Sequence, residues 1–188
     1  MDSTSESLIS QLRRPGNDVA WNQFVSIYSQ PLYNWLTKKS LQPHDALDIV
    51  QQVFVVLVRR LPEFQYDQAG SFRSWLFGIT TNIWKNHVRQ ANRSIGLESD
   101  LDNYQSVDRD HDDMYFQKDV FQSALAVIRP EFHAETWQAF ELHGLQGKPA
   151  KDVAAELGTT IGAVYASRHR VVTRIRQLLW QMDDSLSS

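Results

Sequence analysis

VAAELGTTIGAV, residues 153–164, is the stretch of sequence that decides the fold of the carboxy-terminal part of the chain. Two helices that cross steeply after a three-residue turn need a small side chain at their contact, a turn residue that tolerates positive φ, and branched apolar residues between them. Ala154, Gly158 and the pair Ile161 and Val164 have these properties at the required spacing. The stretch therefore predicts a helix-turn-helix.

The helices of this motif are expected over residues 149–157 and 160–181, with Thr159 or Thr160 capping the second helix. Residues 163–182 carry four arginines and no acidic residue, which favours contact with phosphates. Any corner between two helices can use a small residue and a glycine, and the arginines can also form a solvated basic face. We interpret the motif as DNA-binding, and the side chains expected to reach DNA from its second helix are Thr160, Ala163, Tyr165, Ala166, His169, Arg170 and Arg174.

The composition excludes several classes of protein. The chain has 188 residues, no cysteine and a net charge of −3, so disulfides and thiolate zinc sites are excluded and DNA contact has to come from local basic patches. No apolar stretch is long enough for a membrane helix, so we expect a cytoplasmic protein without membrane insertion. The histidines lack metalloprotease spacing and there is no glycine-rich phosphate loop, so we expect no catalytic site, metal, cofactor or small-molecule substrate.

Helical periodicity recurs along the rest of the chain, and only 8 residues are glycine. The spacing predicts helices over 18–39, 43–60, 71–90, 114–129 and 131–143, with Pro31 bending or breaking the first and Ser71 capping the third. Residues from about 91 to 113 have few apolar side chains, many acidic ones and no sustained period, which is typical of a linker. We therefore predict an all-α fold of two small helical domains, residues 1–92 and 114–188, joined by an acidic linker over 93–113.

Two helices of the first half carry polar residues beside their apolar stripes. In the helix over 43–60, Asp48, Gln51 and Gln52 lie away from the stripe formed by Ala46, Ile49, Val50, Val53, Phe54 and Leu57. In the helix over 71–90, a second face carries Gly78, Asn82, Lys85 and Arg89. Trp75 falls on the apolar stripe and is expected in the core rather than stacked on a base, whereas the pattern leaves Trp84 undecided.

The two halves together resemble bacterial sigma factors of the sigma-70 family, and specifically the extracytoplasmic-function type. The resemblance rests on the segments at 45–54, 72–82 and 147–176, and covers about 21–90 and 114–179. It implies a dissociable subunit that binds RNA polymerase core enzyme, reads promoter DNA at two elements and opens it, while the polymerase performs the chemistry. It also raises an anti-sigma factor as a partner and a linker that threads through the polymerase.

The resemblance assigns roles to particular residues. Asp48, Gln51 and Gln52 would meet the coiled-coil clamp of the largest polymerase subunit. The minus-ten element would be engaged by Phe64, Ala69, Gly70, Ser71, Phe72, Arg73, Asn82, Lys85 and Arg89, and the minus-thirty-five element by the helix from Thr160, with His143 and Lys148 near the phosphates. The sequence departs from the family at Leu47 and Gln52, where acidic residues are usual, and at Tyr165 and Arg168 in the second helix of the motif.

Two other interpretations stay open from the sequence. A stand-alone dimeric helix-turn-helix regulator would explain the carboxy-terminal motif but leaves the first ninety residues without a role. A helical adaptor that never contacts DNA would explain the helices but not the arginines at 163–182. Binding of palindromic DNA by the free protein would favour the first alternative, and unchanged function after Arg170→Ala plus Arg174→Ala would favour the second.

Overall fold

The computed structural model describes residues 8–64, 72–94 and 109–180, and this part of the chain contains helices and no strands. The predicted all-α class is confirmed. The α-helices are α1 (Leu8–Leu12), α2 (Asp18–Lys38), α3 (Pro43–Arg60), α4 (Phe72–Ser94), α5 (Arg109–Ile128), α6 (Ala134–Phe140), α7 (Ala150–Glu156) and α8 (Ile161–Trp180). Two 3-10 turns, η1 (Leu61–Glu63) and η3 (Arg129–Glu131), and a π-helical segment, η4 (Glu141–Leu145), complete them.

Helices α2, α3 and α4 form a bundle around an aromatic core. Phe24 stacks on Tyr28 in α2 with ring centroids 4.6 Å apart, and both rings meet the edge of Phe72 at the start of α4. Trp84 is almost fully buried and lies 5.6 Å from Trp35. Each of these large rings buries much apolar area and adds to the aliphatic side chains of the same core. Trp84 therefore belongs to the core.

Pro31 lies inside α2, and the helix continues through it. Proline removes one backbone hydrogen bond from a helix. The ring of Pro31 is buried against the rest of the bundle, where it contributes apolar contact. The bundle thus keeps the helix in one piece, whereas the sequence left a break open.

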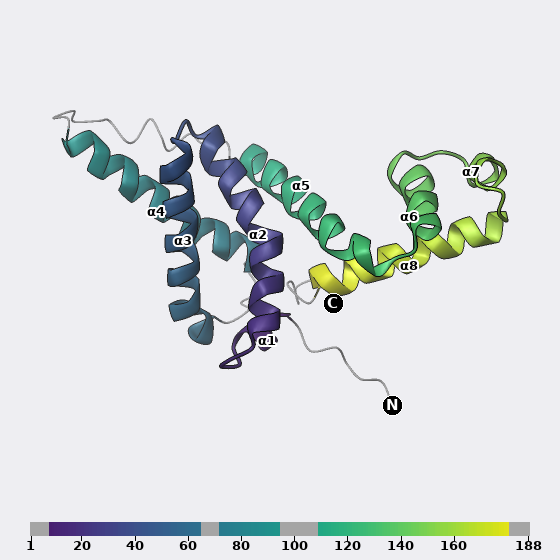
Figure 1. Cartoon of the computed structure of the whole chain (residues 1–188). Coiled ribbons are helices and arrows are strands. Elements are labelled where there is room, and N and C mark those ends of the chain that lie inside the picture. Colours follow the sequence, from purple (N-terminus) through teal and green to yellow (C-terminus); the bar gives the residue numbers. More distant parts are fainter. Residues whose placement is uncertain (1–7, 65–71, 95–108, 181–188) are drawn as a thin grey trace.

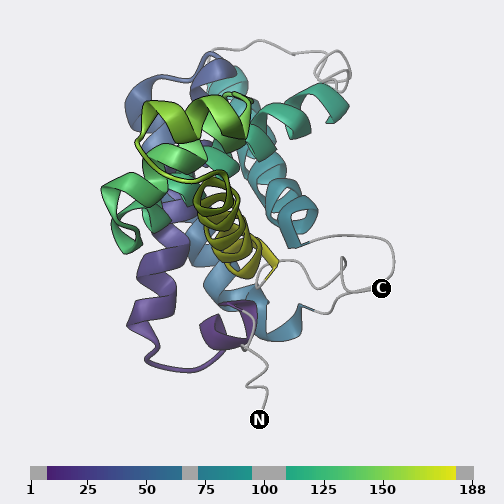
Figure 2. The same cartoon turned by 90° about the vertical axis from the view of Figure 1, so that its right-hand side faces the viewer.

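Helix α5 connects the bundle to the carboxy-terminal helices. Its first half packs on α2, with Phe116 fully buried beside Tyr28 and Phe77, and its second half packs on α8. Figure 1 shows α5 running from α2 to α8, with α6, α7 and the start of α8 standing away from α1–α4. In the view turned by 90°, these carboxy-terminal helices lie in front of the bundle (Figure 2).

The helices extend into both ends of the acidic segment that the sequence assigns to a linker. Helix α4 ends at Ser94 and α5 begins at Arg109, which leaves 95–108 outside the described residues. Phe116 lies in the carboxy-terminal domain of the predicted division but packs on the amino-terminal bundle. The division into two domains at 93–113 stays a prediction.

Candidate nucleic-acid interface

Helices α7 and α8 form the predicted helix-turn-helix. Gly158 adopts φ +62° in the turn, and Ala154 and Val164 are buried where the two helices meet. A φ in the left-handed region is open to glycine at little cost, which explains its place in the spacing. Ile161 was also expected to pack between the two helices, but its side chain is 45% exposed because the turn places it on the outer side of α8.

Helix α6 completes the small core under the motif, a contribution that no sequence pattern predicted. Ala139 of α6 is buried with Ala150 and Val153 of α7, and Leu142 and Leu157 pack against this cluster. The small alanines let three helices approach closely. Their spacing within one helix carries no information about this contact, because the partners come from different helices.

The start of α8 is capped as predicted. The backbone N–H of Ala163 donates to Oγ1 of Thr160 at 3.2 Å, so Thr160 rather than Thr159 is the capping side chain. This bond satisfies one of the free N–H groups at the amino end of the helix. The hydroxyl of Thr160, which was predicted to contact DNA, therefore already accepts a hydrogen bond within the helix cap.

The outer face of α8 presents the residues that the sequence predicts for DNA contact. Tyr165, Ala166, His169 and Arg170 are exposed, whereas Ala163 is half-buried. Val164, Ser167, Val171, Ile175 and Leu178 form the inward stripe. An exposed face with apolar and basic side chains next to one another suits contact with base edges and phosphates.

His143 and Tyr165 hold one another at the edge of this face. Their rings meet edge to face with centroids 5.3 Å apart. Nδ1 of His143 lies 2.8 Å from the carbonyl oxygen of Lys148, which can only accept, so Nδ1 carries the hydrogen. The ammonium of Lys148 lies 3.1 Å from Glu156. His143 and Lys148, both predicted near phosphates, therefore also organise the loop before α7.

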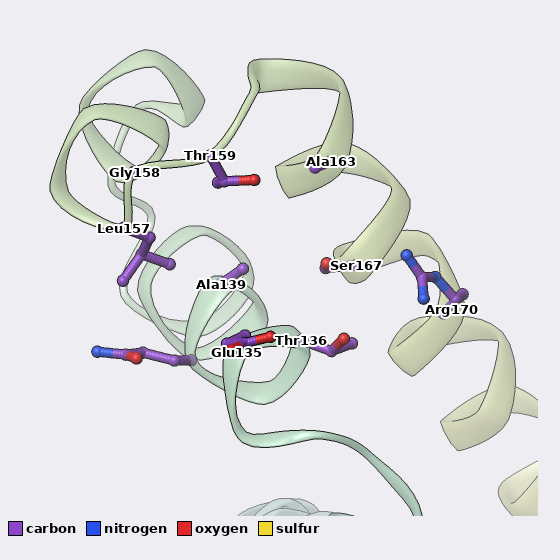
Figure 3. Close-up of a pocket in the computed structure, with 10 residues that line it drawn as sticks. Glu135, Thr136, Ala139, Leu157, Gly158, Thr159, Ala163, Ser167 and Arg170 are labelled. Atoms are coloured by element: carbon purple, nitrogen blue, oxygen red, sulfur yellow. The ribbon is translucent and has the colours of Figure 1, made fainter.

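A hollow of about 440 Å³ lies between α6 and the helix-turn-helix. Figure 3 shows Glu135 and Thr136 of α6 on one side of it and Ser167 and Arg170 of α8 on the other. Arg170 thus stands on the flank of α8 toward α6, beside the outward stripe that carries Tyr165. The hollow is open to solvent between one acidic and one basic side chain.

Arg174 already has a partner within the chain, at the surface. Its guanidinium pairs with Glu131 in η3 through two hydrogen bonds. The sequence predicted phosphate contact for this residue, because an arginine on a basic helix has no visible partner in the sequence. The partner lies 43 residues away and only the tertiary structure reveals it.

The outer face of α3 presents the predicted polymerase-binding residues. Asp48, Gln51 and Gln52 are all exposed. Three apolar side chains, Leu47, Val55 and Val58, are also about half exposed on α3, and the sequence analysis did not single out the two valines. Their positions off the buried stripe were the available signal. The face therefore combines polar and apolar groups, as a protein-binding surface does.

The predicted minus-ten residues divide into two sets. Asn82 and Arg89 are exposed on α4, Lys85 is half-buried, and Arg89 donates to Oδ1 of Asn86 at 3.2 Å. Phe64 and Phe72 are 8% and 0% exposed, and their rings belong to the core. Their side chains therefore anchor the ends of the segment between them.

The remaining residues of that set are less informative. Arg73 is half-buried at the start of α4, and Trp75 packs partly buried against the core, as predicted. Ala69, Gly70 and Ser71, including the predicted cap, lie outside the described residues.

Within the described part, no three acidic or histidine side chains are placed to hold a metal ion, and no helix is long and apolar enough to cross a membrane.

Comparison with known proteins finds similarity to RNA polymerase sigma factors. Residues 24–94 match the family described as Sigma-70 region 2. A protein of Mycolicibacterium smegmatis described as ECF RNA polymerase sigma factor SigE is 28% identical over 165 residues, which are 85% of this chain and 62% of that protein. The chain thus spans less than two thirds of this relative's length.

Two further similarities cover nearly the whole chain. The ECF RNA polymerase sigma-E factor of Escherichia coli (strain K12) is 24% identical over 191 residues, covering 94% of this chain and 96% of the relative. A solved structure of CnrH in complex with the cytosolic domain of CnrY is 23% identical, with coverage of 92% of this chain and 94% of that chain and a TM-score of 0.38.

Proposed function

We propose that the chain is a sigma factor of the extracytoplasmic-function type in the sigma-70 family, which binds core RNA polymerase, directs it to specific promoters and takes part in melting them. The observation that carries this proposal is the presence, in one chain, of a region 2 sequence at 24–94 and a separate helix-turn-helix with an exposed recognition face. The polymerase supplies the catalysis, and this chain supplies recognition.

The exposed face of α3 is the surface proposed to bind the polymerase. Half-exposed Leu47, Val55 and Val58 give it apolar area, and Asp48 with Gln51 and Gln52 gives it hydrogen-bonding groups. Burying apolar area drives association, and the polar groups set the register. The carboxylate of Asp48 also offers charge to a basic partner surface, although Leu47 and Gln52 replace the acids usual in the family.

The α4 face is proposed to act at the minus-ten element. An unpaired base needs polar partners on its edge, and the single strand needs cations near its phosphates. The exposed amide of Asn82 can both donate and accept, and Lys85 and Arg89 lie one and two turns further along α4. The aromatic core beneath α4, with Trp84 and Phe72 buried, gives this face a rigid support.

The outer face of α8 is proposed to read the minus-thirty-five element. Tyr165, Ala166 and His169 would contact base edges, and Arg170 a phosphate on the flank. Two DNA contacts in one chain raise each other's effective concentration, so each can be weak alone. An anti-sigma factor that covers the DNA-binding face of either α4 or α8 would weaken promoter binding as a whole. We include such a partner in the proposal.

Run-off transcription with purified core polymerase over a genomic promoter library tests the proposal. We expect specific transcripts with the chain and core together, and none with either alone. Val55→Asp on the α3 face should abolish transcription by preventing core binding. Val19→Asp is the matched control, because Val19 is likewise exposed but belongs to α2.

The stand-alone regulator predicts the opposite pattern. Tight binding of palindromic duplex DNA by the free dimer, together with no core-dependent transcript, would refute the sigma-factor proposal. The match of residues 24–94 to Sigma-70 region 2 disfavours this alternative, because a stand-alone dimeric regulator would give these residues no role.

A further inference from the structure

The short amino-terminal helix α1, which no sequence pattern predicted, packs against α2. Leu8, Ile9 and Leu12 of α1 are almost fully buried in the main core. Five residues are too few to form a stable helix alone, so this segment is held by its packing. The residue that follows it, Arg13, is thereby placed beside η1.

Arg13 joins α1 to the chain that leaves α3. Its Nε donates to the carbonyl oxygen of Leu61 at 3.2 Å, and its second terminal nitrogen donates to the carbonyl oxygen of Phe64. The carbonyl of Leu61 also accepts from the backbone N–H of Phe64 at 3.2 Å, whereas the carbonyl of Phe64 follows the end of η1, where carbonyls lack partners within the helix. The planar guanidinium can serve both acceptors at once because its donors have a fixed geometry.

Phe64 is held from its other side by α4. Its ring lies 4.5 Å from Trp75 and 5.6 Å from Phe72, both in the first turn of α4. The carbonyl of Phe64 is therefore fixed by Arg13 and its ring by α4. Phe64 is also the last described residue before 65–71, and Phe72 is the first one after it.

We propose that Arg13 is a positioning residue for minus-ten recognition. By holding the carbonyls of Leu61 and Phe64, it fixes Phe64 against the first turn of α4 and so sets the position of the helix that presents Asn82 to DNA. This inference rests on the proposed function. Arg13 itself does not contact a base, and its effect reaches DNA through Phe64, Trp75 and α4.

A contribution from charge alone makes a different prediction. The side chain of Arg13 is exposed, so a cation there could also attract DNA phosphates over a distance. Lysine would preserve that attraction, but its ammonium does not reproduce the two hydrogen bonds that the planar guanidinium donates in fixed directions. Arg13→Lys therefore separates positioning from charge. It also keeps the inference testable if Arg13→Ala fails to fold.

The experiment uses holoenzyme assembled from core polymerase and the full chain, as wild type, Arg13→Lys, Arg13→Ala and Lys118→Ala. Lys118→Ala removes one exposed cation from α5 and is the charge control. Open complexes are measured by permanganate reactivity on a promoter found by run-off transcription and on derivatives with single-base changes in the minus-ten element. Core affinity and thermal unfolding are measured alongside.

We expect both Arg13 variants to reduce discrimination between the promoter and its minus-ten derivatives by at least about threefold, as the loss of one or two hydrogen bonds would. Core affinity and discrimination at the minus-thirty-five element should stay unchanged. The inference is overturned if Arg13→Lys behaves like wild type, or if both variants lose activity equally on every promoter in step with stability. If wild-type chain with core gives no specific transcript, the proposed function itself has failed.

Discussion

Arg174 in α8 and Glu131 in η3 form a two-point ion pair, with Nε 2.6 Å from Oε2 and the second nitrogen 2.8 Å from Oε1. The pair ties the middle of α8 to the corner between α5 and α6. It lies one turn beyond Arg170, whose guanidinium faces the hollow beside α6. Two arginines that look equivalent in the sequence therefore have different surroundings.

Arg170→Ala should weaken binding of holoenzyme to minus-thirty-five DNA more than Arg174→Ala does. Loss of a phosphate contact lowers the slope of log affinity against log salt by about 1, and we expect that change for Arg170→Ala only. Fluorescence anisotropy over a salt series measures it. Equal slopes for the two variants would contradict the assignment.

Arg174→Ala should instead reduce stability. The pair is partly exposed, so its contribution is about 1 kcal/mol or less, and it should shrink in high salt. Urea unfolding of Arg174→Ala, Glu131→Ala and the double variant forms a mutant cycle that isolates the coupling. A coupling energy of zero would show that the pair does not hold α8 to η3.

Replacing glycine by alanine should change stability in opposite directions at two sites. Gly158 has φ +62°, so alanine there should destabilise the protein by about 1 kcal/mol through backbone strain. Gly78 lies within α4, where alanine should stabilise it by about 0.5–1 kcal/mol. An added Cβ has nothing within 4 Å at either position, so clashes do not enter the comparison. Urea unfolding measures both, and the same sign at the two sites would contradict the backbone argument.

Asn82→Ala should impair strand opening more than closed-complex formation. Asn82 is exposed on α4 and offers both hydrogen-bonding functions to an unpaired base, which duplex binding does not need. Permanganate reactivity of promoter thymines measures opening, and filter binding at low temperature measures the closed complex. Asn22→Ala, at an exposed position of α2, is the control. Normal permanganate reactivity in Asn82→Ala would refute the role.

Phe116→Ala should destabilise the amino-terminal bundle by about 3–5 kcal/mol, because it removes a buried ring that contacts both α2 and α4. Hydrogen exchange of the full chain locates the effect. Loss of protection in α2 and α4 would show that α5 stabilises the bundle. Loss confined to α6–α8 would instead support the division at 93–113.

The features that could be predicted from sequence are those set by residues close together in the chain. Gly158, Ala154 and Val164 lie within one motif, and its turn needs a residue that tolerates positive φ, so their spacing was sufficient to predict the helix-turn-helix. The buried stripe of α3 follows from helical periodicity for the same reason. Helix α1 escaped prediction because five residues show less than two turns of any period.

By itself, the sequence determined the all-α class, the helix-turn-helix and the polar faces of α3 and α4, because helix propensity and periodicity act over a few residues. Only the tertiary structure decided that Arg174 pairs with Glu131, that Arg13 holds Phe64, and that Phe72 serves the core. These contacts join residues far apart in the chain. A partner across such a separation is chosen by how whole helices pack, and no local pattern records it.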